Sequence, residues 1–335
     1  MKKILILIII LLFLGGCEQD NQIIIYTNSN QTRTSWYTEY AKEEGFNVKI
    51  ITLGGYDMYH RLLAEKNEPY ADVFFGVNIP DAKEMEELGM LEKFTPDWKD
   101  DLVYKVNSDY FYPLVTDAIL LYYNKSIENP PETYSDLTNP IYDHKYTIKR
   151  FGGYTSRLFI GQILLDYVDE SGELNINEEG WTELEQIINN CVYAKTFDTS
   201  LEDVIDNTIP MAITNAATLA AYQLNNPESN IGIVSNNNEV LYTYSNVGIL
   251  KNNNNTEASI EFVKWLGSEK VQLEYAKEFG LYTNNGKARE QLPEELLEFY
   301  EQLPEPFEYD TQFYNDNIDS WIKKLDIDFV EKLRY

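Results

Sequence analysis

Residues 22–78 read QIIIYTNSNQTRTSWYTEYAKEEGFNVKIITLGGYDMYHRLLAEKNEPYADVFFGVN, and they alternate short apolar runs with longer polar segments. The apolar runs lie at 23–26, 47–53 and 71–75, and each ends in a loop of glycine, amide or hydroxyl residues. Continuous apolar strands that alternate with helices are typical of a parallel sheet covered on both faces. The pattern therefore predicts an α/β protein whose ligand site lies beyond the carboxyl ends of the strands.

The same alternation continues along the rest of the chain. Further strands are predicted near 117–123, 145–149, 211–214, 230–234 and 240–250, and helices near 158–167, 180–194, 215–224, 256–266 and 269–279. The tail from residue 293 onward is predicted to be helical and acidic, with Trp321 and Ile322 as its apolar anchors. We find no internal repeat of the kind that marks a solenoid.

The N-terminus has the features of an export signal. Two lysines precede an apolar run at 4–14, which is too short to span a bilayer comfortably and ends in small residues. Leu14-Gly15-Gly16-Cys17 resembles the lipobox of bacterial lipoproteins. This resemblance implies a signal peptide over 1–16, lipidation of Cys17 and a tether over 17–21, with the protein on the extracytoplasmic face of the cell membrane. The alternative is an ordinary signal anchor that happens to contain a cysteine.

Composition excludes several classes of partner. The 335 residues contain 27 Lys and Arg against 55 Asp and Glu, a formal net charge of −28, so we expect no nucleic-acid binding. The charge favours solubility; a sharper interpretation is enrichment of cationic solutes near the surface. The length suggests two domains. Apart from the lipidated Cys17 the only cysteine is Cys191, which excludes an internal disulfide and suggests a small core residue.

No catalytic motif is visible. The two histidines, His60 and His144, lie in no recognisable pattern, and the chain has no HExxH, no Walker lysine loop, no nucleophile elbow and no Gly-x-Gly fingerprint. Acidic residues are so frequent that a pair of them carries no information. We therefore expect a protein that is not an enzyme and has no cofactor or resident metal. A cell-surface lipoprotein enzyme is the alternative of another class.

An ordered set of short motifs resembles the extracellular solute-binding proteins of ABC importers, in the branch that binds ferric ion and related small solutes. The matching pieces are 24–27 (IIYT), 44–48 (EGFNV), 61–65 (RLLAE), 71–76 (ADVFFG), 121–124 (LYYN), 134–140 (YSDLTNP) and 258–272, with Ala258, Phe262, Leu266-Gly267-Ser268-Glu269 and Gln272. None is diagnostic alone, but together they span most of the chain.

This resemblance implies a two-lobed fold of the type II periplasmic-binding-protein class, each lobe a mostly parallel sheet flanked by helices. Its lobes would be 22–115 with 248–285, and 116–247 including the crossing strands near 116–124 and 244–250. Residues 286–335 would form a helical segment packed on the second lobe. The resemblance also implies a monomer that closes over one solute molecule and delivers it to a membrane permease.

Loops at strand ends and helix starts supply the candidate ligand-binding residues: Asn28, Ser29, Tyr56 and Asn78 in the first lobe, and Thr155, Ser156, Arg157 and Asn215 in the second. Thr155 and Ser156 at a helix start would offer N–H donors and a favourable dipole to an anion. Arg157, or Arg150, would add a bidentate clamp. Alternatively, Ser156 is only a helix cap and both arginines balance nearby acids.

The solute class is left open between three chemistries. The helix start and arginines favour a phosphate, phosphonate or carboxylate compound. Iron carriers of this kind are expected to have adjacent tyrosines in the second lobe, but residues 214–218 here read TNAAT, and the existing pair Tyr122-Tyr123 lies in a predicted crossing strand. A cationic solute, such as a polyamine or a thiamine-like molecule, is favoured by the net charge and by aromatic walls.

Overall fold

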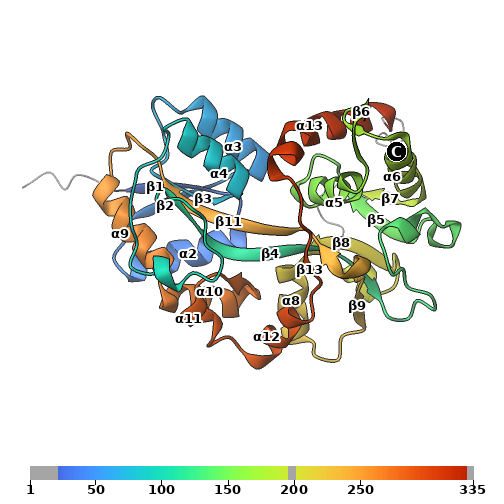
Figure 1. The fold of residues 1–335 in the computed structure, drawn as a ribbon. Helices are drawn as coiled ribbons and strands as arrows, with labels where there is room; N and C mark the ends of the chain where they lie inside the picture. The colour runs from blue at the N-terminus through green and yellow to red at the C-terminus, as the bar shows by residue number, and fades with distance from the viewer. Residues whose placement is uncertain (1–21, 195–200, 330–335) are drawn as a thin grey trace, which may run out of the picture.

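The computed structural model describes residues 22–194 and 201–329, which fold into two α/β lobes joined by long strands (Figure 1). The predicted signal peptide, Cys17 and the tether lie outside the described residues. Within the described ranges, no helix combines the length and apolar character needed to cross a membrane.

The first lobe is built on the alternating pattern of residues 22–78. Strands β1 (Ile23–Thr27), β2 (Val48–Thr52) and β3 (Val73–Val77) pair in parallel, as predicted, and β1 lies in the middle. The helices that follow them are α2 (Gln31–Glu43), α3 (Gly55–Ala64) and α4 (Ile79–Glu87). A short 3-10 helix η1 (Lys99–Asp101), helices α9 (Thr256–Leu266) and α10 (Glu269–Phe279), and strand β12 (Tyr282–Thr283) complete this lobe.

Two antiparallel strands run from one lobe to the other. They are β4 (Phe111–Asn124), which is 14 residues long, and β11 (Tyr242–Ile249), and they contain the segments expected to cross. One side of β11 pairs with β3, while the far half of β4 pairs with β8 and β9 in the second lobe. Because one strand enters both sheets, the strand order runs continuously as β2-β1-β3-β11-β4-β8-β5-β7. Figure 1 shows β4 and β11 spanning the space between the lobes.

The second lobe has a mixed sheet. Its strands are β5 (Tyr146–Lys149), β7 (Val192–Ala194), β8 (Met211–Asn215) and β9 (Ile231–Ile233). Strand β5 pairs in parallel with β7 and β8. Strands β8 and β9 pair antiparallel with β4. The helices are α5 (Tyr154–Leu165), α6 (Glu178–Asn190), α7 (Leu201–Ile205) and α8 (Ala216–Asn225). Shorter elements are β6 (Val168–Glu173), β10 (Glu239–Val240) and the 3-10 helices η2 (Ser135–Thr138), η3 (Pro140–Tyr142) and η4 (Asn236–Asn238).

The helix predicted over 180–194 is shifted in the structure. It begins earlier, because Asn177 caps it by accepting a hydrogen bond from the N–H of Gly180, and it ends at Asn190. The last predicted turn is instead strand β7, which pairs with β5 through Val192 and Tyr193. Branched and aromatic side chains favour such a strand. Cys191, between the two elements, is buried as expected.

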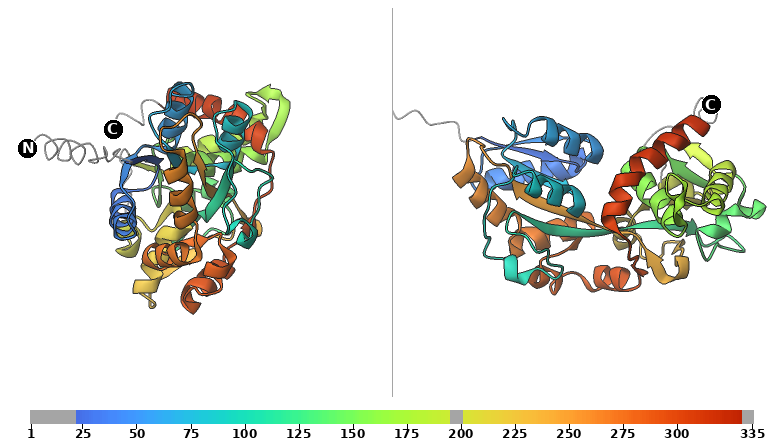
Figure 2. Two further views of the ribbon diagram at one scale, coloured as in Figure 1. Left: turned by 90° about the vertical axis from the view of Figure 1, so that its left-hand side faces the viewer. Right: turned by 45° about the horizontal axis from the view of Figure 1, so that its top comes forward.

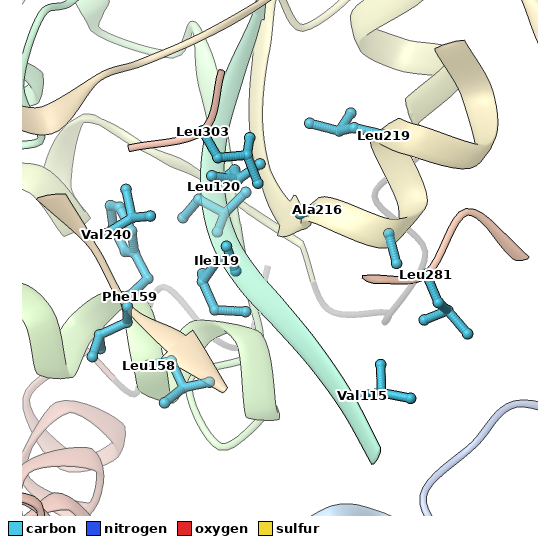
Figure 3. Close-up of a cluster of buried hydrophobic side chains, with 14 of the residues drawn as sticks. Val115, Ile119, Leu120, Leu158, Phe159, Ala216, Leu219, Val240, Leu281 and Leu303 are labelled. Atoms are coloured by element: carbon cyan, nitrogen blue, oxygen red, sulfur yellow. The ribbon is translucent and has the colours of Figure 1, made fainter. Parts of the chain in front are cut away.

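One apolar core runs across the junction of the lobes. Val115, Ile119 and Leu120 of β4 lie among buried side chains from α5, α8 and the segments near Val240, Leu281 and Leu303 (Figure 3). This cluster continues into both lobes. The crossing strands are therefore anchored by packing on either side, which fixes the floor between the lobes.

The C-terminal segment, expected to pack on the second lobe, divides between two places. Helix α11 (Gly286–Arg289) contacts α10 and β12 of the first lobe, and α12 (Glu294–Glu301) contacts α8. Strand β13 (Glu305–Pro306) then pairs with β10, and α13 (Thr311–Asp328) packs on α5 and also contacts α4 of the first lobe. Figure 2 shows α13 lying along the second lobe beside the gap. The expected anchors Trp321 and Ile322 are both buried.

Candidate functional site

A cavity of about 240 Å³ opens between the lobes. Its lining comes from the first lobe, the crossing strands and the second lobe, and consists of Asn28, Ser29, Asn30, Arg33, Phe75, Val115, Asp117, Ile119, Tyr154, Thr155, Asn215, Thr218, Thr243, Ser245, Tyr275 and Leu281. Hydroxyl, amide and charged groups predominate. A mixed lining of this size is suited to one small polar molecule.

The loop after β1 forms one wall. Asn28 donates a hydrogen bond from Nδ2 to the carbonyl of Gly76 (3.0 Å), and Thr27 Oγ1 lies 3.1 Å from Ser29 Oγ. Gly76 has φ +114°, and a Cβ there would come within 2.1 Å of Asn28 Oδ1. A glycine is therefore required for the Asn28 side chain to lie across the end of β3.

Arg33 brings a positive charge to this wall. It lies in the first turn of α2, whose N-cap Asn30 accepts a hydrogen bond from the Arg33 N–H (3.0 Å). The guanidinium lies 5.8 Å from the ring centroid of Phe279, and its charge counteracts the rise that burial causes in the pKa of Tyr275. Among the described residues that line the cavity, Arg33 is the only lysine or arginine. It is therefore the group best placed to hold an anion.

Asp117 supplies a negative charge on the floor. This largely buried residue of β4 accepts hydrogen bonds at Oδ2 from Asn215 Nδ2 (2.7 Å) and at Oδ1 from the N–H groups of Ala118 (3.0 Å) and Ala217 (3.1 Å). Because Ala217 is in the first turn of α8, the Asp117 carboxylate occupies the positive end of that helix. The start of α8 is thus already matched with an anion from the protein itself.

The start of α5 forms the opposite wall. Its N-cap is Gly153, so no side chain caps the first turn, where Tyr154 and Thr155 line the cavity. The Tyr154 ring comes close to the first lobe, since a Cβ added to Gly55 would lie 3.8 Å from its Cδ2 atom. The Tyr154 phenol lines the cavity and can donate a hydrogen bond to a molecule bound there. This helix end offers donors to an anion.

Four of the eight predicted binding residues line the cavity: Asn28, Ser29, Thr155 and Asn215. Ser156 is buried and donates from Oγ to the carbonyl of Lys149 (3.0 Å), which is a structural bond inside the second lobe. Tyr56 lies in the first turn of α3. Asn78 caps α4 by accepting from the N–H of Asp81 (2.8 Å), as a helix-capping asparagine does.

Arg157 lies at the contact between α4 and α13 instead of in the cavity lining. It forms an ion pair with Asp319 of α13, and its positive charge also reaches Asp81 at the start of α4. The arginine that lines the cavity is therefore Arg33 and not the predicted Arg157. Arg150, the other arginine considered, acts electrostatically on Asp326 of α13.

Three acidic residues, Asp81 and Glu84 of α4 and Asp319 of α13, lie close together where these two helices make contact between the lobes. Burial raises the pKa of Asp81 to about 7; Glu84 and Asp319 add to the rise, while Asn78 and Arg157 oppose it. The pKa of the unfolded carboxyl is near 3.8, so the folded protein holds this proton up to higher pH. Because the folded state binds more protons, its stability falls as the pH rises from 3.8 to about 7.

Replacing Asp81 by asparagine is expected to remove this fall in folding stability with rising pH. The amide oxygen can still accept the 2.9 Å hydrogen bond from Asn78 Nδ2 but carries no charge. We expect the variant to be more stable than the wild type by about 1–2 kcal/mol above pH 7, after discounting for partial solvent exposure, and equal to it near pH 4. Urea denaturation at several pH values measures this. A constant difference across the range would contradict it.

Sequence reasoning missed several lining residues: Asn30, Arg33, Asp117, Tyr154, Thr218, Thr243, Ser245 and Tyr275. For two of them a clue existed. Arg33 follows Asn30 by three residues at a predicted helix start, and Asp117 is the one charge at the edge of a long apolar strand. A charge beside a run that crosses between lobes indicates a site facing the gap.

A family model described as bacterial extracellular solute-binding protein matches residues 35–305. A probable ABC transporter periplasmic-binding protein, y4fP, from Sinorhizobium fredii is 25% identical over 312 residues, which cover 91% of this chain and 86% of that protein.

Solved structures with the same fold include two bacterial binding proteins. Apo ferric ion-binding protein A of Pasteurella haemolytica has a TM-score of 0.72 at 18% identity, covering 91% of this chain and 97% of that one. AfuA of Actinobacillus pleuropneumoniae, solved with fructose-6-phosphate, has a TM-score of 0.69 at 17% identity, covering 93% and 98%. At these identities the structures show the two-lobed fold alone.

Proposed function

The chain belongs to the bacterial extracellular solute-binding protein family, and on this basis we propose that it captures a small anionic solute for an ABC importer. The solute, a phosphate, phosphonate or carboxylate compound, lies in the cavity between the lobes. A membrane permease then receives it unchanged. A lipid on Cys17 holds the protein, as a monomer, at the extracytoplasmic face of the membrane.

The observation that carries this proposal is the two-sided lining of the cavity. Arg33 from the first lobe and the uncapped start of α5, with Thr155, from the second lobe both present donors to the same space. An anion held by both is bound fully only when the lobes are close together. Its binding free energy therefore favours the closed state, which is the state that a permease can recognise.

The relative from Sinorhizobium fredii carries a name that includes the ABC transporter, which supports the importer assignment. AfuA, with its bound fructose-6-phosphate, supports a phosphate-bearing solute. The ferric ion-binding proteins support iron as the other candidate. Against iron, residues 214–218 lack the adjacent tyrosines expected of an iron carrier, and the existing pair Tyr122-Tyr123 lies in β4, with Tyr122 in the core.

A thermal-shift screen tests the proposal. Purified protein is heated with phosphate esters, phosphonates, carboxylates, polyamines, thiamine and ferric salts, and a bound compound raises the melting temperature by mass action. We expect stabilisation by members of the anionic group, and mass spectrometry should recover the bound compound chemically unchanged. Stabilisation and colour from ferric salts alone would replace the anion by iron. Conversion of a bound compound would identify an enzyme instead.

A further inference from the structure

The carboxylate of Asp117 retains hydrogen-bonding capacity toward the cavity. An ionised carboxylate accepts about four hydrogen bonds. Asp117 receives two at Oδ1 and one at Oδ2 from described residues, and it lines the cavity from its floor. A buried anion that faces a polar cavity is most stable when a donor completes its shell.

Its electrostatic surroundings leave that charge only partly compensated. Burial raises the pKa of Asp117, whereas the hydrogen bond from Asn215 and the positive charge of Arg33 lower it. A purely anionic solute would be attracted by Arg33 but would also lie close to the Asp117 carboxylate. Like charges at such a site repel, and the exclusion of water strengthens the repulsion.

We propose that Asp117 selects, among anionic solutes, those that also carry an ammonium group a few bonds from the acid group. The acid end lies between Arg33 and the start of α5, and the ammonium donates to Asp117 Oδ2. Either an ammonium or a hydroxyl can donate to the carboxylate, but only the ammonium also brings a positive charge that offsets the charge of Asp117, so the ammonium is favoured over a hydroxyl. The inference rests on the proposed function and specifies its solute class.

Matched probes test the inference. One trio is ethyl phosphate, ethylene glycol monophosphate and phosphoethanolamine, and the other is butyrate, 4-hydroxybutyrate and 4-aminobutyrate. Within each trio the acid is constant while the far end carries nothing, a hydroxyl or an ammonium. Affinities for the wild type, Asp117→Asn and Arg33→Gln are measured by titration calorimetry at fixed pH. Asp100→Asn, which removes an equal charge at an exposed position, is the control.

We expect the ammonium member to bind the wild type most tightly in at least one trio. Asp117→Asn should weaken that member about tenfold or more and strengthen the unsubstituted acid, because repulsion is removed. Arg33→Gln should weaken all members alike. The asparagine oxygen can still accept from the Ala118 and Ala217 N–H groups, whereas the hydrogen bond from Asn215 Nδ2 is lost, so the apo melting temperature of the variant checks the fold.

Two results would overturn the selection by Asp117. One is equal wild-type affinity for ammonium and unsubstituted members, in which case anion capture stands and only the second subsite fails. The other is no binding of either trio at millimolar concentration. If the broader screen also finds no anion that binds, the proposed function fails as well. If that screen finds other anions, the selection by Asp117 alone is refuted.

Discussion

Replacing Arg33 by glutamine is expected to weaken the binding of a stabilising anion about 100-fold. Arg33 is the single cation among the described cavity-lining residues, and glutamine can donate a hydrogen bond but cannot supply the charge. The loss should appear mainly in the dissociation rate, since a desolvated charge contact is broken. Calorimetry with the anion found by thermal shift measures the loss of affinity.

Lys42→Gln provides the matched control. Lys42 lies in the last turn of the same helix, is exposed and does not line the cavity, so the change in net charge is identical. We expect its affinity to stay within about twofold of the wild type, because an exposed charge is screened by salt. Equal losses in the two variants would assign the effect to net charge, and no loss in Arg33→Gln would remove Arg33 from the site.

Truncating Trp321 to alanine is expected to produce the largest loss of stability, about 3–5 kcal/mol. The indole is fully buried, packs near Phe313 and Tyr314, and donates from Nε1 to the carbonyl of Leu174 (2.9 Å). Its removal leaves a cavity under α13 and an unpaired acceptor. Denaturant unfolding followed by circular dichroism measures the change.

Ile327→Ala, in the last turn of the same helix, is the comparison. Ile327 is 62% exposed, and its truncation should change the free energy of unfolding by no more than about 0.5 kcal/mol. A Trp321→Ala variant as stable as Ile327→Ala would mean that α13 is not integral to the second lobe. The helix would then be a loosely attached appendage.

Much of the fold could be predicted because local patterns determine it. The segments 23–26, 47–53 and 71–75 form parallel strands because each is rich in branched or aromatic apolar residues and is bounded by loop residues. Segments whose strand pairing is non-local are harder to predict from the sequence. Strand β7 was merged into the preceding helix, because only its pairing with β5 distinguishes a strand from another helical turn.

The binding site was predicted only in part, because local patterns reveal its loops but not the packing that orients its side chains. Strand-end and helix-start loops are visible in the sequence, and Asn28, Ser29, Thr155 and Asn215 come from them. The side chain that a helix start turns toward the cavity is set by tertiary packing. Ser156 therefore points into the second lobe, where it donates a hydrogen bond to the carbonyl of Lys149. Arg157 pairs with Asp319 of α13, which lies 162 residues further along the chain.

Asp117 shows why floor residues are the hardest to find. Its neighbours in sequence, Thr116 and Ala118, are buried, and only the pairing of β4 with β11 and β8 places Asp117 on the floor of the cavity. No turn or capping motif marks such a position. A charge in the middle of a crossing strand is the most useful indicator in this fold.

Small-angle X-ray scattering with and without the stabilising solute tests most directly whether the two lobes close over a bound molecule. At saturation we expect the radius of gyration to fall and the scattering to match the structure described above, in which α4 and α13 touch. Without solute, the lobes should separate and the radius should be larger. Identical curves for the two samples, with binding proven by calorimetry, would contradict closure around the solute.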